Sequence, residues 1–569
     1  MSYKPLVVSL LIALLSSCAR TGSKGVVRIA ILPVENLTAD AELSWISAAL
    51  QQGVVTQLDG APDLTVLASF DSNDALQDRA SRVLKAYVTR RGSSLQVNAQ
   101  IRDVDSGKTM HTMDSLSSSP LDLAAAMARA VWPQAKAFTT TNPGAFEKFG
   151  RAIYRKPVAE SVPLLREALA ADPQFLDAQI WLASQLAASG DRPGALEALR
   201  GQDPSDPLRL ARKQLAMGSL QQDSKARMDA FASILRLAPR DSNSARQAGQ
   251  LGMLSRQFAQ AAAAYRQAVA TDPENAGLYN EAAYAYFFAG DLNAALSSVD
   301  IYARLSPGAN PLDSKAEILH MAGRFDEASK TFEAAYSKEP AFLGSITLRK
   351  AAESRRKAGD AAAADALFQR YLDALGQNPL APLLRAQWDY SSGRKQRAVE
   401  NAMKLAEGGS SVAWSQLAIW RLLDGGDARA AAAQAAKTMR SPVDRRAAAV
   451  AFFATQPKAD GAEWNRRAEK FFQSPADVEF RRQTLAYTLL LHKQWADAAK
   501  IIEELWRAQG PATATQLQAL LARAWRESGR AKDAQALETI HPLPVSVPDW
   551  LMECLLIPVA QSSRPVALR

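Results

Sequence analysis

The chain offers few of the side chains that catalysis or metal binding commonly uses. Its four histidines, His111, His320, His492 and His541, lie far apart and have no acidic or cysteine neighbour at the short spacings typical of metal ligands. The sequence also lacks a glycine-rich phosphate loop, a nucleophile elbow and a dinucleotide-binding pattern. We therefore expect no catalytic residue, no metal site, no cofactor and no small-molecule substrate, and we expect that the protein is not an enzyme.

The two cysteines are the remaining reactive side chains. Cys18 follows a single cation, Lys4, and an apolar run over residues 6–15. This composition is typical of a secretory signal and the run is too short to span a membrane. Cys554 lies in an apolar segment over residues 550–559, where a buried and inert thiol is expected.

The residues Leu15-Ser16-Ser17-Cys18 resemble the lipobox of bacterial lipoproteins, whose cysteine is lipidated and becomes the amino terminus after cleavage. The resemblance implies a signal peptide over 1–18, a linker over 19–25 and lipidation of Cys18. It also implies a bacterial envelope protein, and Ala19, which is not Asp, favours the outer membrane. We expect the chain to face the periplasm, although the sequence leaves the choice of membrane leaflet open. Stable anchoring would follow from several acyl chains. The alternatives are an uncleaved signal anchor or a coincidental cysteine.

The basic composition does not indicate a nucleic-acid partner. The formal net charge is +9, but it is the balance of 67 basic and 58 acidic residues spread over the chain and does not form a patch. On an exported protein such a surface would meet anionic lipid, lipopolysaccharide or acidic proteins. Arginines that are merely solvated on exposed helix faces explain it as well.

Residues 26–140 show the mixed periodicity of a small α/β domain. Turn residues such as Pro33, Arg90-Arg91-Gly92 and Asp105-Ser106-Gly107 separate its segments. The pattern predicts strands over 26–32, 64–67, 83–88, 94–104 and 109–116, and helices over 41–58, 72–80 and 121–136.

This region resembles the small domain related to the amino-terminal domain of TolB, which often precedes tetratricopeptide repeats in bacterial signalling proteins. The resemblance depends on the segment 29–38 (IAILPVENLT), on Trp45 and on residues 95–108. It implies that the strand-proline-x-x-Asn-Leu segment has a structural role. The third strand departs from the family pattern. The family usually has an apolar-rich segment that contains glycine at this place, whereas this chain has residues 82–87 (RVLKAY).

From about residue 145 the chain becomes alanine-rich with helical periodicity and regular prolines. Pro173, Pro207, Pro239, Pro273, Pro307 and Pro340 are 34, 32, 34, 34 and 33 residues apart, which is the period of tetratricopeptide (TPR) repeats. A proline at this interval ends each helix pair because its ring cannot continue the helix. Small residues such as Ala283 and Ala295 and aromatic residues such as Tyr286 fall in phase with it.

The predicted fold is therefore mainly α, a TPR-type α-solenoid with a small amino-terminal α/β domain. We expect the solenoid over 145–440, an irregular helix pair and further TPR-like repeats over 441–541, and a proline-containing carboxy-terminal cap and tail over 542–569. Three prolines early in the last segment prevent a helix there, and we expect it to fold back over the last repeat.

The first helix of each TPR pair lines the concave surface of a solenoid. The positions expected there carry Arg212, Arg246, Asn280, Tyr284, Phe287 and Phe288. Such a ladder could grip an extended peptide by hydrogen bonds, carboxylate pairing and aromatic contact. Arginines that are simply exposed, and aromatics that pack between repeats, are the alternative.

These features predict a membrane-anchored scaffold or adaptor that binds other proteins or extended peptides through the groove. The alternative is a regulatory or sensory subunit of a signalling system whose output enzyme is a separate chain, because a TolB-like domain with repeats usually accompanies such an output domain. Neither the partner nor the oligomeric state follows from the sequence.

Overall fold

The computed structural model describes residues 27–154, 157–439, 441–474, 477–543 and 550–560. Cys18 and the predicted signal and linker lie outside these ranges. The chain divides into two compact units, residues 1–248 and 249–569. Each unit is described by itself.

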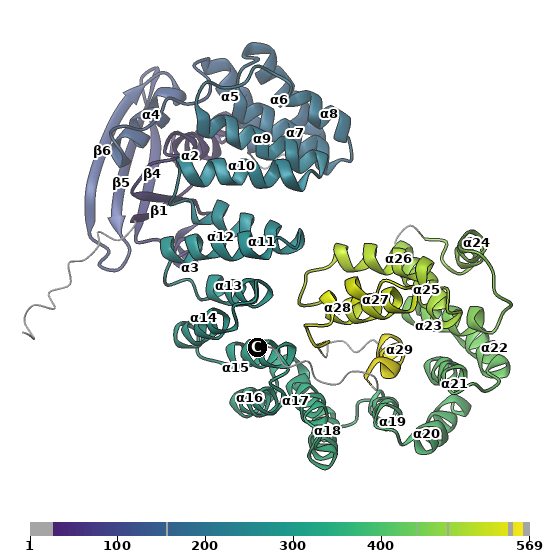
Figure 1. Cartoon of the computed structure of the whole chain (residues 1–569). Coiled ribbons are helices and arrows are strands. Elements are labelled where there is room, and N and C mark those ends of the chain that lie inside the picture. Colours follow the sequence, from purple (N-terminus) through teal and green to yellow (C-terminus); the bar gives the residue numbers. More distant parts are fainter. Residues whose placement is uncertain (1–26, 155–156, 440, 475–476, 544–549, 561–569) are drawn as a thin grey trace, which may run out of the picture. The chain divides into compact units, whose positions relative to one another are not determined.

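The first unit contains one mixed sheet, in the order β3-β1-β4-β5-β6, with the short β2 beside β4 (Figure 1). Strand β1 runs parallel to β3 and β4, and β4, β5 and β6 form an antiparallel meander. The strands are β1 Val27–Ile31, β2 Glu35–Asn36, β3 Leu64–Ala68, β4 Arg82–Arg91, β5 Ser94–Asp103 and β6 Thr109–Ser117.

Helices cover the apolar face of this sheet. Strand β5 alternates buried and more exposed residues, so that Val97 and Ala99 pack under α2 and α4. The predicted small α/β domain is present. Its helical elements are η1 Ala41–Leu43, α2 Ile46–Gln57, α3 Ser72–Gln77 and α4 Pro120–Val131.

The sheet and the first helix pairs share one hydrophobic core. A Cβ atom on Gly150 of α5 would lie 2.5 Å from the Trp45 ring and 2.7 Å from the Ala49 Cβ atom, so only glycine allows α5 to approach α2 this closely. The junction near residue 140 thus lies within a continuous core. The helices are α5 Pro143–Ile153, α6 Val158–Ala171, α7 Leu176–Ala188, α8 Arg192–Ala198, α9 Pro207–Gln221 and α10 Ser224–Leu237. The next helix, α11 Ser242–Leu254, contains the boundary between the two units after residue 248.

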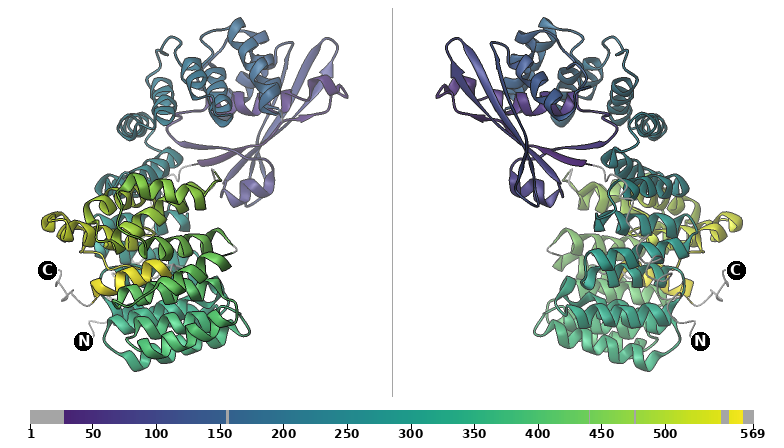
Figure 2. Two further views of the ribbon diagram at one scale, coloured as in Figure 1. Left: turned by 90° about the vertical axis from the view of Figure 1, so that its right-hand side faces the viewer. Right: turned by 90° about the vertical axis from the view of Figure 1, so that its left-hand side faces the viewer.

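The second unit is a solenoid of antiparallel helix pairs that stack side by side (Figure 2). Helix pairs continue through the region where the sequence phase blurs, as α23 and α24. The elements are α12 Phe258–Thr271, α13 Ala276–Phe288, α14 Leu292–Leu305, α15 Ala309–Met321, α16 Phe325–Lys338, η2 Phe342–Ser345, α17 Ile346–Lys357, α18 Ala361–Leu375, α19 Ala381–Ser391, α20 Lys395–Glu407, α21 Ser411–Leu423, α22 Arg429–Thr438, α23 Pro442–Ala454, α24 Gly461–Phe471, α25 Val478–Leu491, α26 Trp495–Ala508, α27 Thr515–Glu527, α28 Ala531–Leu537 and α29 Trp550–Ala560.

The repeat residues do what their period predicts. Pro273 and Pro307 lie in loops after the second helix of a pair, and Gly290 turns between the two helices with φ +91°. Ala283 and Ala295, where paired helices approach, are fully buried. The predicted TPR-type solenoid is confirmed.

Candidate functional site

Two of the six predicted groove residues lie in the first unit. The Arg212 guanidinium on α9 forms ion pairs with Asp59 at 2.9 Å and Asp241 at 2.5 Å. Burial alone would lower the pKa of Arg212, but these carboxylates outweigh it and raise the pKa. Arg212 therefore joins α9 to the loop after α2 and to the start of α11. Arg246 is exposed on α11.

The other four candidates lie on α13 in the second unit. Phe288 stacks on Phe258 with 5.2 Å between ring centroids, and Phe287 packs edge-on against Phe288. These two rings fill space between repeats. Asn280 is half-buried, and its Oδ1 atom has no hydrogen-bond partner among the described residues. The Tyr284 hydroxyl donates to Glu317 Oε2 at 2.5 Å.

Tyr284 is one end of a buried polar network that connects α13, α15 and α17. Lys350, which is 1% exposed at its side chain, donates to Glu317 Oε1 at 2.7 Å and to Asp313 Oδ2 at 2.8 Å. Burial raises the pKa of Asp313, against the opposing effect of Lys350. One cation between two carboxylates fixes three successive first helices to one another.

Residue spacing could have revealed this network. Tyr284, Glu317 and Lys350 are 33 residues apart, and Asp313 lies 33 residues after Asn280. Glu317 and Asp313 therefore occupy the repeat positions of Tyr284 and Asn280 one repeat later, and Lys350 occupies the position of Tyr284 two repeats later. The groove prediction ended at α13 and missed them.

The segment after α28 runs back across the second unit. We call residues 540–543 the strap. The His541 amide donates to the Met321 carbonyl at 3.1 Å, and the Leu543 amide donates to Thr515 Oγ1 at 3.0 Å. Ile540 and Leu543 also pack in the cluster around Ala283 and Ile318. The strap thereby links α15 to α27.

Helix α29 follows and rests on the first helices of several repeats. Glu553 forms an ion pair with Arg349 of α17 at 2.5 Å, and Cys554 Sγ accepts a hydrogen bond from Trp420 Nε1 of α21 at 3.1 Å. Arg523 of α27 donates to the Leu555 carbonyl at 2.8 Å. The expected cap thus contacts the last repeat and also repeats far from it. Because first helices line the inner face of a TPR solenoid, α29 occupies the inner face of this unit (Figure 1).

Arg256 joins the start of the second unit to the end of α26, about 250 residues later in the chain. Arg256, in the turn before α12, donates to the carbonyls of Trp506 and Gln509 and stacks 4.5 Å from the Trp506 ring centroid. Burial, together with the nearby Arg507, lowers the pKa of Arg256 to about 10. The guanidinium binds carbonyl groups at the end of α26, where a helix favours a cation.

His320 makes the docking of the strap sensitive to acid. Its Nε2 atom faces the Pro542 carbonyl at 3.1 Å, so this nitrogen carries the hydrogen, and Nδ1 lies 2.8 Å from Ser354 Oγ. Burial lowers the pKa of His320 to about 3, whereas the Pro542 carbonyl raises it. The neutral form is therefore the one that the folded state holds.

Acidification should destabilise the second unit through this group. The stability that neutral His320 contributes is complete above the unfolded pKa of about 6.5 and is lost as the pH falls toward the folded value. We expect about 3 kcal/mol of lost unfolding free energy between pH 7 and pH 4. In urea unfolding, His320→Gln should lose about 3 kcal/mol less than the parent over this interval, and the exposed His111→Gln should behave like the parent. Equal losses in parent and His320→Gln would contradict the assignment.

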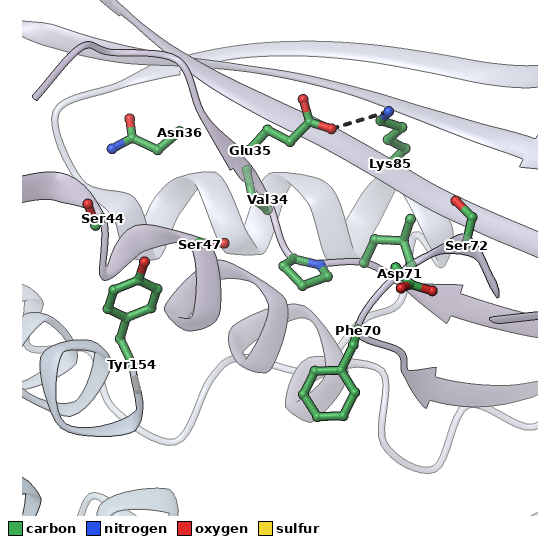
Figure 3. A pocket seen from close by; sticks show the side chains of 12 residues that line it. Val34, Glu35, Asn36, Ser44, Ser47, Phe70, Asp71, Ser72, Lys85 and Tyr154 are labelled. Carbon is green, nitrogen blue, oxygen red and sulfur yellow. Dashed lines mark ion pairs between the residues drawn. The ribbon is translucent and has the colours of Figure 1, made fainter. Parts of the chain in front are cut away.

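A separate pocket of about 430 Å³ lies in the first unit where β1 and β3 end (Figure 3). Glu35 and Lys85 in its wall pair with each other at 3.2 Å, and both side chains are half exposed. The Asn36 side chain donates from Nδ2 to the Asp40 carbonyl, and its Oδ1 accepts from the Thr38 backbone amide. The side chain therefore holds the turn after β2. These groups serve the local structure and do not indicate a ligand.

Metal binding and membrane crossing have no structural support in the described ranges. No group of three or more His, Cys, Asp or Glu side chains there is arranged to hold a metal ion. Within the same ranges, every helix is too short or too polar to cross a bilayer.

No protein-family model matches the sequence, and no curated protein matches it. Among solved structures, a MamA protein is 16% identical with a TM-score of 0.26, and the match covers 30% of this chain and 93% of that one. A tetratricopeptide repeat protein from Parabacteroides merdae is 17% identical with a TM-score of 0.31, over 41% of this chain and 93% of that one. YrrB, described as a TPR protein with an unusual peptide-binding site, is 14% identical with a TM-score of 0.25, over 39% and 97%. These TM-scores are too low to indicate a function. The function must be inferred from the residues of this chain.

Proposed function

We propose that this protein is a non-enzymatic scaffold of the bacterial cell envelope, anchored by lipid on Cys18, that binds partner proteins on the inner face of its second unit. One observation carries the proposal: that face already holds a helix, α29, by an ion pair and hydrogen bonds from α17, α21 and α27. A surface that holds a helix in the same chain has the shape and polar groups to hold one from another protein.

The anchor is the second part of the proposal. Its support is the sequence around Cys18, where a short apolar run and small residues precede the cysteine. A protein held at a membrane surface meets its partners in two dimensions, which raises their effective concentration.

Photo-crosslinking in intact bacteria tests both parts. A benzoyl-phenylalanine at position 280, on the same face of α13 as Tyr284, should yield crosslinked partners in the membrane fraction. The same residue at position 334, exposed on the second helix α16, is the matched control and should yield few. Cys18→Ser should move the protein to the soluble fraction. Equal crosslinking at both positions would reject inner-face binding, and unchanged membrane association of Cys18→Ser would reject the lipid anchor.

A further inference from the structure

Helix α29 is apolar on all sides. Glu553 is the single charged residue in its sequence, and Leu551, Cys554 and Leu555 are each at most 4% exposed. A helix of this composition needs cover on every side to stay in water. The second unit covers the side chains of Leu551, Met552, Cys554 and Leu555, which are all buried.

The surface that receives α29 is not a plain apolar core. Arg349 is 4% exposed, and its guanidinium would be costly to bury without the Glu553 carboxylate. Burial lowers the pKa of Arg349, but the carboxylates of Glu553 and Glu353 together outweigh burial and raise the pKa. Arg523 and Trp420 add donors toward a carbonyl and a sulfur of the same helix. The surface therefore recognises an apolar helix that carries a carboxylate at one position.

The fit between α29 and this surface is incomplete. Glu553 Oε1 accepts from Nη2 of Arg349, whereas Nη1 is buried and has no hydrogen-bond partner among the described residues. A guanidinium binds a carboxylate best with two parallel hydrogen bonds. The Nη1 donor of Arg349, which α29 leaves without an acceptor, could bind a second oxygen of a ligand whose carboxylate fits better.

We propose that α29 is an internal ligand, and that the inner face binds an apolar helix of a partner protein whose carboxylate engages both terminal nitrogens of Arg349. This inference rests on the proposed function and specifies its partner. The strap stays in place through its own bonds to α15 and α27.

The occupant is a different protein and not a second copy of this chain. The α29 helix of a second copy would have the same one-sided pairing with Arg349 and would gain nothing over the tethered helix. The tether gives the internal helix an effective concentration on the order of millimolar. Only a helix with better carboxylate geometry overcomes that advantage.

The first experiment measures release of α29 in the full-length protein. With Cys18→Ser, Cys554 is the only thiol, and it is buried against Trp420. Glu553→Arg should increase the rate of maleimide labelling of Cys554 at least about tenfold. The exposed Glu504→Arg, whose partner Arg482 is also exposed, is the matched control and should leave the rate unchanged. Glu553→Gln, which keeps the side-chain shape, replaces the arginine variant if that variant does not fold by circular dichroism.

The second experiment measures binding of a helix in trans by fluorescence anisotropy. The probe is a labelled peptide of residues 550–560 with serine at position 554 and a lysine tail for solubility. It should bind the Glu553→Arg protein at least about tenfold more tightly than the parent, and a peptide with Gln at position 553 should bind at least about tenfold more weakly. Adding Arg349→Glu to the Glu553→Arg protein should abolish binding of the glutamate peptide.

Three results would overturn the inference. One is a folded Glu553 variant in which Cys554 stays protected. Another is the absence of peptide binding to a variant in which Cys554 is labelled quickly. The third is dimerisation of the Glu553 variant in size-exclusion chromatography with light scattering, which would make a second copy the occupant. Crosslinks at position 280 together with any of these results would leave the proposed function intact.

Discussion

Lys350→Met should lower the unfolding free energy of the second unit by about 3–5 kcal/mol, because it leaves two buried carboxylates without their cation. Asp313 and Glu317 both accept hydrogen bonds from Lys350 Nζ, and none of the three side chains is more than 17% exposed. Urea unfolding of the purified protein, followed by circular dichroism, measures the loss. The exposed pair of Lys315 and Asp300 gives the control, since Lys315→Met should cost at most about 1 kcal/mol.

The pH dependence of this variant identifies the cause. Without Lys350, the buried Asp313 carboxyl enters the folded state more easily when protonated, so the loss should be smaller at pH 5 than at pH 8. The stability of the parent protein depends on pH in the same direction through Asp313. Because burial raises the pKa of Asp313, the contribution of this group to stability is favourable at low pH and is lost as the pH rises. Adding Asp313→Asn and Glu317→Gln to Lys350→Met should restore much of the stability. A loss that is independent of pH, with no rescue, would mean that packing of the lysine stem is what matters.

Trp420→Ala should cost about 3–5 kcal/mol and should also release α29. The Trp420 side chain is fully buried, stacks on Tyr390 with 4.5 Å between ring centroids, and donates to Cys554. Its removal leaves a cavity between α19, α21 and α29. Urea unfolding measures the first effect, and faster maleimide labelling of Cys554 measures the second.

Trp414 on the same helix provides a matched comparison. Its side chain is half-buried and packs at the edge of the same core. Trp414→Ala should cost clearly less and should leave Cys554 protected. Equal labelling of the two variants would show that α29 responds to general loosening of the unit and not to the loss of Trp420.

The fold class was predictable because its signals are local. Pro273 and Pro307 fall one repeat apart and end helix pairs wherever the tertiary structure places them, since a proline ring breaks a helix by its own geometry. The alternation along residues 94–103 likewise determines which side chains of β5 face the core. The resemblance to the TolB-related domain, the lipid anchor and the outer-membrane location remain predictions.

The candidate site was predicted only in part, and the reason is physical. The repeat phase places Arg212 on a first helix but does not say which acidic side chain it meets. Its partner Asp59 lies 153 residues earlier in the chain. An arginine that appears available from its repeat position is therefore already paired.

The sequence by itself determined that helix pairs would stack with a period of about 34 residues, that small residues would lie at their crossings, and that residues 550–559 needed burial. It did not determine where that burial would occur. The small rotation of each repeat accumulates along a solenoid, and only the sum brings α17, α21 and α27 around one helix. The pairing of Arg349 with Glu553, 204 residues apart, is a property of that curvature. Only the tertiary structure decided that the inner face of this solenoid is occupied by the end of its own chain.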